Sequence, residues 1–406
     1  MNIGNVQTLR SQEEKRTLPN GWRWVKLGEV CQIIAGQSPP GSTYRSSPEG
    51  LPFFQGKAEF GETNPVARVW CVEPTKTART GDILISVRAP VGPTNVANVE
   101  CCIGRGLAAI RCGSYSDRDF ILNALRHFES TLIKKGSGST FEAINRDDLE
   151  SFEIPVPPLP EQRRIAGVLR EQMAVVEKAR AAAYARLEAV KALPAAFLRQ
   201  VFPKPGQPLP TGWRWIRLSE VVDVRDGTHD TPQYVDNGIP LVTSKNLRHE
   251  GIDFSNALFI SKEDHDQIKK RSGVNKGDIL FAMIGTIGNP VIVKTEDPFS
   301  IKNVALFKFE NGFVLNEYFY YLLSSQVIIM QLDKDSQGGI QKFVSLAVLR
   351  NLQIPLPPMP EQKRIAALLY KQMVAVEKAR AAAEAELETI NALPSALLRR
   401  AFNGEI

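Results

Sequence analysis

The chain has 406 residues, of which 43% are hydrophobic and 23% are charged, so its size and composition suit a globular protein with two domains. It has no stretch of about 18 uncharged apolar residues, and residues 1–17 form a polar tail without the apolar run of a secretory signal. We therefore expect a cytoplasmic protein with no membrane partner. The net charge of +6 permits a polyanionic partner, because lysine and arginine gain free energy by releasing counterions from phosphates.

In chain order, the sequence alternates between variable domains and repeated segments. We predict a polar tail at 1–17, a first domain at 18–154, a strut and helix at 155–203, a second domain at 204–354, and a second strut and helix at 355–406. Shorter islands also recur: LPNGWRWVKLGEV at 18–30 resembles LPTGWRWIRLSEV at 209–221, and GDILISVRAPVG at 81–92 resembles GDILFAMIGTIG at 277–288. An internal repeat of this kind predicts two domains of similar architecture.

Both variable domains are predicted to be mixed α/β. Apolar runs at Asp82–Val87, Asp278–Ala282 and Val291–Val293 lie between glycine, proline and asparagine residues, which is typical of short strands. Phe120–Phe128 and Glu317–Ser324 have helical spacing. The order of the strands does not follow from the sequence.

The repeated segments predict two long helices. Residues 155–202 and 355–402 align without gaps at an offset of 200, with 30 of 48 positions identical. Their prolines predict a stiff extended strut, followed by a helix over 161–193 and its counterpart, with Pro194 and Pro394 marking the end or a kink. A 3.5-residue apolar repeat is typical of a coiled coil, and two copies on one chain pair most simply in antiparallel fashion. The predicted seam consists of Leu169, Met173, Val176, Ala183, Leu187 and Val190 in the first copy and Leu369, Met373, Val376, Ala383, Leu387 and Ile390 in the second.

Two arginines fall on this seam. Arg180 and Arg380 would be costly there if buried without a partner, so we expect each to reach solvent or to pair with Glu177 or Glu377.

Metal-binding and catalytic motifs are not found. Cys31, Cys71, Cys101, Cys102 and Cys112 are odd in number and lack CxxC spacing, so we predict buried reduced thiols. The four histidines lack metal-ligand spacing. No Pro-Pro pair belongs to the Asn/Asp-Pro-Pro-aromatic loop of an adenine methyltransferase, and GQSPPGST at 36–43 carries Ser42 where a phosphate-binding loop needs lysine. We therefore predict no metal site and no catalytic residue.

The order of these motifs resembles the specificity subunits of type I restriction-modification systems (the HsdS family). The resemblance is carried by LPxGWxWxxLxEV, GDILxxxxxxxG, and the IPxPPxPEQxRIA segment that leads into each long helix. It covers nearly the whole chain and is close in the second domain, at DGTHDTPQY, ISKEDH and GTIG. It implies two target-recognition domains held apart by an antiparallel helix pair.

The resemblance also implies a function and partners. The chain would bind double-stranded DNA with a bipartite target, together with two methyltransferase subunits and the restriction subunits. Those partners would bring S-adenosylmethionine, ATP and Mg²⁺, none of which this chain would bind directly. The similar outer faces of the two helices favour docking of the methyltransferase subunits, with Arg164 and Arg364 as candidate contacts.

Base readout requires hydrogen-bond donors and acceptors on loops, and phosphate contacts set the register. The polar loops of the first domain offer Gln37, Ser38, Tyr44, Arg45, Gln55, Lys57, Arg88, Lys134, Lys135 and Ser137, of which Lys134 and Lys135 are typical phosphate contacts. The second domain offers Thr228, His229, Gln233, Tyr234, Lys245, Asn246, Thr286 and Gln341. For His229, an interaction with Asp226 and Thr228 that stabilises its own loop is an equally good hypothesis.

Two alternative hypotheses assign the chain to other functional classes. A scaffold or adaptor could use two similar domains to bind protein instead of DNA, and steep salt dependence of duplex binding would distinguish DNA recognition from it. A self-contained nuclease or methyltransferase is disfavoured by the missing motifs.

Overall fold

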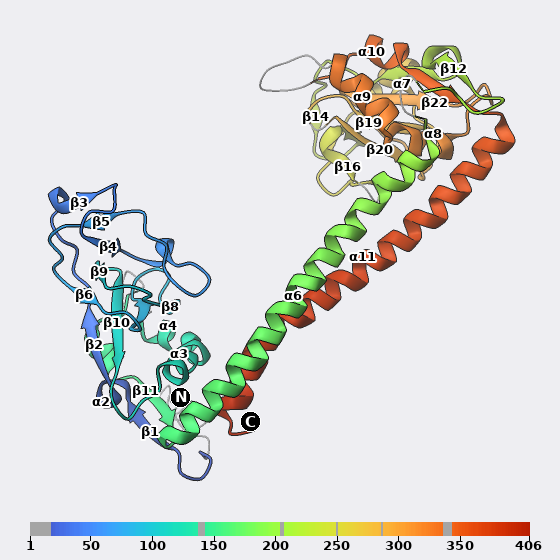
Figure 1. Cartoon of the computed structure of the whole chain (residues 1–406). Helices are drawn as coiled ribbons and strands as arrows, with labels where there is room; N and C mark the ends of the chain where they lie inside the picture. The colour runs from blue at the N-terminus through green and yellow to red at the C-terminus, as the bar shows by residue number, and fades with distance from the viewer. Residues whose placement is uncertain (1–17, 137–142, 204–206, 249–250, 286, 336–342) are drawn as a thin grey trace, which may run out of the picture. The chain divides into compact units, whose positions relative to one another are not determined.

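The computed structural model describes residues 18–136, 143–203, 207–248, 251–285, 287–335 and 343–406. The chain forms two units, each mixed α/β as predicted (Figure 1). Unit 1 runs to Tyr184 and also includes Glu386–Ile406, whereas unit 2 is Ala185–Ala385. Each unit therefore combines one variable domain with parts of both long helices.

Unit 1 is built on two packed sheets. Its antiparallel sheet has the order β2 (Cys31–Ala35), β10 (Leu107–Cys112), β7 (Ile83–Ser86), β8 (Thr94–Val96), and its second sheet has the order β3 (Tyr44–Arg45), β5 (Trp70–Cys71), β4 (Leu51–Phe54), β9 (Cys101–Ile103), β6 (Thr77–Ala78). Successive side chains of a strand point to opposite faces. Accordingly, Leu84 packs with Phe54 and Ile103 between the sheets, whereas Ile83 and Ile85 belong to a separate core on the other face.

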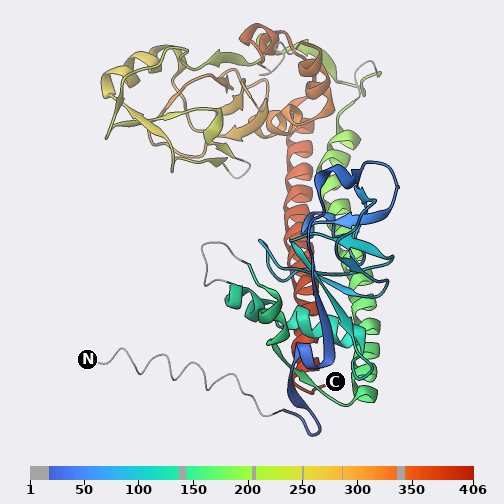
Figure 2. The ribbon, with the colours of Figure 1, turned by 90° about the vertical axis from the view of Figure 1, so that its left-hand side faces the viewer.

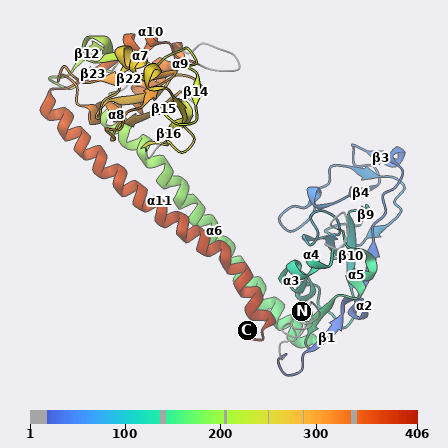
Figure 3. The same ribbon diagram turned by 180° about the vertical axis from the view of Figure 1, so that it is seen from behind.

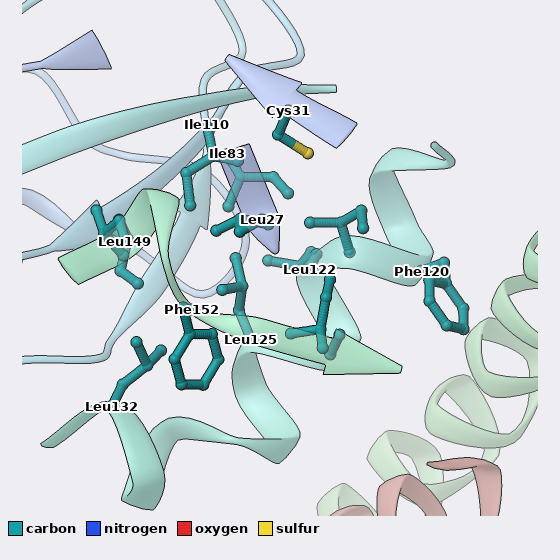
Figure 4. Packing of buried hydrophobic residues seen from close by; sticks show 14 of the residues in the cluster. Leu27, Cys31, Ile83, Ile110, Phe120, Leu122, Leu125, Leu132, Leu149 and Phe152 are labelled. Carbon is teal, nitrogen blue, oxygen red and sulfur yellow. The ribbon is translucent and has the colours of Figure 1, made fainter. Parts of the chain in front are cut away.

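Helices cover that other face. The short α2 (Leu27–Val30) and α5 (Arg146–Glu150) flank the sheet, and α3 (Arg118–His127) is followed by α4 (Glu129–Gly136). The α3 helix begins at Asp117, whose side chain accepts a 3.0 Å hydrogen bond from the amide of Phe120. Leu122 and Leu125 gather with residues of the strands, while Phe120 points toward the long helices (Figure 4). The α3 helix thus joins the sheet to the helical part of unit 1.

Unit 2 repeats this plan with its own core. Its sheets have the orders β13 (Asp223–Asp226), β22 (Val304–Lys308), β19 (Ile279–Ala282), β20 (Gly288–Ile292) and β14 (Tyr234–Val235), β18 (Leu258–Ile260), β15 (Ile239–Val242), β21 (Ser300–Ile301), with a small hairpin of β16 (Leu247–Arg248) and β17 (Gly251–Ile252). Its helices are α7 (Lys262–Ser272), α8 (Asn316–Leu323), α9 (Gln326–Asp335) and α10 (Leu346–Asn351). The α8 helix lies beside the end of α6, where the Phe202 and Tyr318 rings are 5.6 Å apart (Figure 3).

The first proline of each repeated segment, Pro155 or Pro355, lies in an edge strand rather than in a free strut. In unit 1, β1 (Arg23–Lys26) pairs with β11 (Glu153–Val156), and in unit 2, β12 (Arg214–Arg217) pairs with β23 (Gln353–Leu356). Each pair is a two-stranded sheet, in which a proline has an open side for its missing donor. The tryptophan-containing island of each copy therefore holds the proline segment that leads into its long helix.

The long helices α6 (Leu159–Val201) and α11 (Met359–Phe402) extend further than predicted. The sequence predicts that each helix ends or kinks at Pro194 or Pro394. An end at these residues is wrong, because both prolines lie inside the helices. The residues that follow them have apolar partners: Leu398 and Phe402 belong to the core of unit 1, and Leu198 and Phe202 to that of unit 2. This burial offsets the cost of an internal proline, about 3 kcal/mol.

The two helices are antiparallel. In unit 1, the start of α6 packs against the end of α11, with Ile165 and Leu169 in one cluster with Leu398 (Figure 2). In unit 2, the end of α6 shares a cluster with Ile365 and Leu369 from the start of α11. All twelve predicted seam residues are buried or half-buried.

The arginines on the seam reach solvent, as expected. Arg180 pairs with Glu177, and Arg380 pairs with Glu377 at 2.8 Å and with Glu384 at 3.2 Å.

The recurring GDIL island has a structural role in both units. Its aspartate accepts a backbone hydrogen bond from the residue three positions earlier and pairs with a cation on the neighbouring strand. In unit 1, Asp82 pairs with Arg111 at 2.7 Å, and in unit 2, Asp278 pairs with Lys308 at 2.8 Å. The unit 2 pair is almost completely buried, with side-chain exposures of 7% for Asp278 and 3% for Lys308. Burial raises the pKa of Asp278, although Lys308 acts in the opposite direction.

We expect Lys308→Met to lower the free energy of unfolding of unit 2 by about 3–5 kcal/mol, because it leaves a buried carboxylate without its cation. The Lys308→Met/Asp278→Leu double variant should recover most of this loss, since it removes both charges. Calorimetric unfolding of the full chain measures both effects, with Lys294→Met as the control at an exposed lysine. Equal loss in the single and double variants would contradict the ion-pair explanation.

Candidate nucleic-acid interface

A basic pocket lies where four loops of unit 1 meet. The loops follow β2, β4 and β7 and connect β9 to β10. The pocket has a volume of about 290 Å³ and is lined by Ser38, Gln55, Gly56, Lys57, Ser86, Arg88, Ala89, Arg105 and Gly106. Three of these residues are cationic and none is acidic. The lining therefore suits a ligand with negative charge or exposed acceptors.

The cations of this pocket are not neutralised within the described part of the chain. There, the guanidinium groups of Arg88 and Arg105 and the ammonium of Lys57 have no hydrogen bond or ion pair, and all three residues are exposed. By contrast, Arg111 and Arg118 of the same unit are paired with aspartates. Unpaired cations in one hollow are the electrostatic footprint expected of a nucleic-acid contact.

The turn that carries Arg105 is held firmly by its backbone. The Gly104 amide donates to the carbonyl of Phe54 at 2.8 Å, and the Arg105 amide donates to Ser38 Oγ at 3.3 Å. A Cβ on Gly106 would lie 2.1 Å from the carbonyl oxygen of Gln55, so only glycine fits there. Arg105 is a residue that the sequence prediction missed.

The structure brings four predicted residues of unit 1 together and separates the rest. Ser38, Gln55, Lys57 and Arg88 line the pocket. Five others lie outside its lining: Gln37 is exposed, Tyr44 and Arg45 are on β3, and Lys134 and Lys135 are on α4. Ser137 falls outside the described residues.

Tyr44 and Arg45 have partners within their own loop, and their predicted contacts with DNA stay predictions. The Tyr44 hydroxyl donates to the carbonyl of Pro39 at 2.9 Å, and its ring packs 4.8 Å from that of Phe53. Arg45 donates to two carbonyls and pairs with Glu49 at 3.6 Å. These side chains stabilise their own loop.

Lys135 also has an intramolecular partner. Its ammonium lies 5.7 Å from the ring centre of Phe152 and 3.5 Å from Ser151 Oγ. Both lysines remain exposed, which is compatible with the predicted phosphate contacts.

Unit 2 has an equivalent location, identified by identical backbone bonds. In unit 1 the Gly36 amide donates to the carbonyl of Leu107, and in unit 2 the Gly227 amide donates to the carbonyl of Val304, at 2.9 Å in both cases. Likewise, the Gly104 amide donates to the carbonyl of Phe54 as the Lys302 amide donates to that of Val242. These bonds place Lys302 of unit 2 where unit 1 has Gly104, and the single residue Asn303 stands where unit 1 has Arg105 and Gly106.

His229 is fixed at this location in unit 2. Its Nε2 lies 2.9 Å from Asp226 Oδ2, and its Nδ1 lies 2.9 Å from Asn303 Oδ1. Asp226 also pairs with Arg271, and the Lys302 ammonium donates to Thr231 Oγ1. The contact with Asp226 matches the loop-stabilising hypothesis, whereas the His229 side chain is still 60% exposed.

The remaining predicted residues of unit 2 differ in accessibility. Thr228 is half-buried beside His229, whereas Gln233, Tyr234 and Lys245 are exposed. Thr286 and Gln341 lie outside the described residues.

Asn246 is engaged in contacts within its own loop. Asn246 is only 6% exposed, its Oδ1 accepts from the amide and hydroxyl of Thr243, and its Nδ2 donates to the carbonyl of Asp253 at 3.0 Å. Its side chain stabilises this loop, and its predicted contact with DNA stays a prediction.

The predicted docking residues lie on the first turns of the long helices. Arg164 makes two 2.7 Å hydrogen bonds to Glu161, and Arg364 makes the same pair with Glu361. Arg164 also donates to the carbonyl of Ile406, so in unit 1 the C-terminal residue lies beside the start of α6 (Figure 2). These guanidinium groups lower the pKa of Glu161 and of Glu361.

The cysteines are reduced, and four of the five are buried, as predicted; Cys112 is half-buried. Burial raises the pKa of Cys101 to about 12. Cys31 and Cys112 face each other across β2 and β10, with their sulfur atoms 3.8 Å apart. Among the described residues, there is no cluster of three histidine, cysteine or acidic side chains that could hold a metal ion. The helices in the described part of the chain are too short or too polar to cross a membrane.

Comparison with known proteins identifies the family. The model of the type I restriction modification DNA specificity domain matches residues 19–179 and 210–384. The putative MjaX specificity subunit of Methanocaldococcus jannaschii is 46% identical over 156 residues, which are 38% of this chain and 37% of that protein. The MjaVIII specificity subunit of the same organism is 24% identical over 86% of this chain and 85% of its own. The EcoBI specificity subunit of Escherichia coli is 22% identical over 96% and 87%.

Solved structures share the fold. A chain from structural work on complex assembly and conformational transition of the type I R-M system has a TM-score of 0.79 and 23% identity, covering 96% of this chain and all of that one. The HsdS subunit from Thermoanaerobacter tengcongensis has a TM-score of 0.63 and 24% identity, covering 97% and 99%. The adaptor hypothesis is not favoured, because both variable domains match the DNA specificity model. The chain belongs to the type I restriction-modification specificity subunits and carries two DNA specificity domains.

Proposed function

We propose that this chain directs a type I restriction-modification complex to a bipartite target in double-stranded DNA. Each variable domain would read one half-site, and the chain itself would supply specificity rather than catalysis. The observation that carries the proposal is the pocket of unpaired Lys57, Arg88 and Arg105, in a domain that matches the DNA specificity model.

The partners are part of this proposal. Two methyltransferase subunits would join the chain and carry S-adenosylmethionine for N6-methylation of adenine. Restriction subunits would add ATP- and Mg²⁺-dependent cleavage of unmodified DNA. The complex would act in the prokaryotic cytoplasm, where it meets incoming DNA. The curated relatives support these roles because they are named as specificity subunits of type I restriction enzymes.

Duplex binding by the chain co-expressed with its methyltransferase subunit tests the proposal. We expect sequence-specific binding whose affinity falls steeply with salt, because each phosphate contact releases counterions. The methylated motif, read by long-read sequencing in a host without adenine methylation, should consist of two half-sites separated by an unspecified gap. Binding without a sequence preference would contradict the proposal.

Arg164 and Arg364 offer a test of the docking surface. We expect the Arg164→Glu/Arg364→Glu double variant to weaken co-purification with the methyltransferase subunit by about tenfold or more at moderate salt. Each substitution replaces an exposed positive charge by a negative one and places it beside the carboxylate of Glu161 or Glu361. Arg199→Glu/Arg399→Glu, at exposed positions further along the same helices, is the matched control. Normal co-purification of the first variant would exclude these residues from the docking surface.

A further inference from the structure

We propose that Arg105 reads a guanine in the half-site of unit 1, and that Lys57 contacts the adjacent phosphate. This inference rests on the proposed DNA recognition and adds a specificity-determining residue and the base that it reads. It comes from one juxtaposition: an unpaired arginine on a rigid turn, inside a pocket with no acidic side chain.

The first step concerns rigidity. The turn of Arg105 is bonded to three of the loops that line the pocket: to Phe54, to Ser38 Oγ, and through the 3.0 Å bond from the Val87 amide to the Gly106 carbonyl. A Cβ on Gly104 would lie 3.2 Å from both the Phe53 ring and Ser38 Oγ, so the turn is closely packed. Specific readout needs a donor that starts from a fixed position, and these bonds fix the backbone from which the Arg105 side chain extends.

The second step compares the two units. Positions that contact phosphate can be alike in both domains, because the phosphate backbone carries no sequence information. Positions that read bases must differ if the half-sites differ. Lys57 and Lys245 are both exposed lysines, each three residues after the equivalent ends of β4 (Phe54) and β15 (Val242).

The third step concerns the position that differs. Between these equivalent backbone positions, unit 1 has Arg105 and Gly106 where unit 2 has only Asn303, so the two turns differ in length and carry unlike donors. Asn303 is already hydrogen-bonded to His229, whereas the guanidinium of Arg105 has no such partner in the described part of unit 1. Arg105, which lines the pocket together with Ser38 and Gln55, is therefore the better candidate for base readout in unit 1.

The fourth step is the identity of the base. Arginine presents two parallel N–H groups, which match the O6 and N7 acceptors of guanine in the major groove. Ser38 and Gln55 add neutral donors and acceptors around it. Lysine, a point charge on a flexible stem, is better suited to a phosphate than to a base edge.

The test uses the full chain with its methyltransferase subunit and duplexes in which each base pair of the methylated motif is changed singly. Arg105→Ala should reduce discrimination at one G·C pair by about tenfold to a hundredfold, and leave the other half-site unchanged. Arg105→Lys keeps the charge but not the paired donors, so it should lose most of this discrimination too. Lys57→Ala should weaken binding to all sequences equally and reduce the salt slope by about 1.

Arg146→Ala is the matched control, because it removes an arginine of unit 1 that is paired with Glu150 outside the pocket. The proposal is overturned if Arg105→Ala weakens all sequences equally with a smaller salt slope, which would make Arg105 a phosphate contact. It is also overturned if the relaxed position is an A·T pair or lies in the other half-site, or if the variant binds like the wild type. Failure of the wild-type complex to recognise a bipartite motif would instead reject the proposed function.

Discussion

Exchanging residues 18–154 for the same region of another specificity subunit should replace one half of the methylated motif and leave the other half unchanged. Each variable domain has its own core, since Phe54, Ile83 and Leu125 belong to clusters of unit 1, and Phe281 and Phe307 to a cluster of unit 2. A domain with its own core can be exchanged without rebuilding its counterpart. The change in specificity should therefore be complete for one half-site.

The junction of this exchange is compatible with the fold. It falls within β11, whose pairing with β1 is made by backbone groups and includes Trp24 opposite Pro155. The incoming domain must still provide an aromatic contact for the end of α11, where the ring centres of Phe120 and Phe402 are 5.3 Å apart. A donor with an aromatic residue at that position is therefore the better choice.

Sequencing of the methylated motif in a host without adenine methylation measures the outcome. The reciprocal exchange of residues 204–354 is the control, and it should change only the other half-site. A change in both half-sites after the first exchange would show that the domains do not read DNA independently. If no methylation occurs, co-purification with the methyltransferase subunit distinguishes failed assembly from altered recognition.

The helices could be predicted from sequence because their signal is local and duplicated. Apolar residues such as Leu169 and Leu369 recur at coiled-coil spacing in both copies, and burial of the predicted seam follows from it. The helix ends could not be predicted. Pro194 and Pro394 indicate an end or a kink by local rules, whereas the tertiary burial of Leu198 and Leu398 keeps the chain helical.

The site was only partly predictable because it is assembled from distant loops. Ser38, Gln55, Lys57 and Arg88 were predicted as polar loop residues, but nothing local shows that they line one pocket. Arg105 was missed, although a signal existed in Gly104-Arg105-Gly106 between two apolar runs, which is typical of a tight turn.

Conversely, Asn246 has a suitable residue type, but its side chain is buried. Its amide is used by Thr243 and Asp253 within a 3₁₀ turn. Polarity in a loop therefore indicates a hydrogen-bonding group but does not say whether the group is free.

We expect the long helices to set the length of the gap between the half-sites. Both α6 and α11 continue from residues of one unit to residues of the other, and each is more than 40 residues long, or about 65 Å at 1.5 Å per residue. Ala183 and Ala383, next to the boundaries between the units, are 2% and 3% exposed.

Inserting a matched four-residue helical turn after Ala183 and after Ala383 should lengthen the unspecified gap by one or two base pairs, with both half-sites unchanged. Four residues add about 6 Å to each helix, whereas one base pair adds about 3.4 Å along DNA. Four residues are also close to one turn of 3.6, so the apolar seam remains nearly aligned. An insertion after Ala183 alone should instead put the two helices out of register and abolish methylation. Sequencing of the methylated motif reports the gap directly, and an active double-insertion variant with an unaltered gap would show that the helices do not set the spacing.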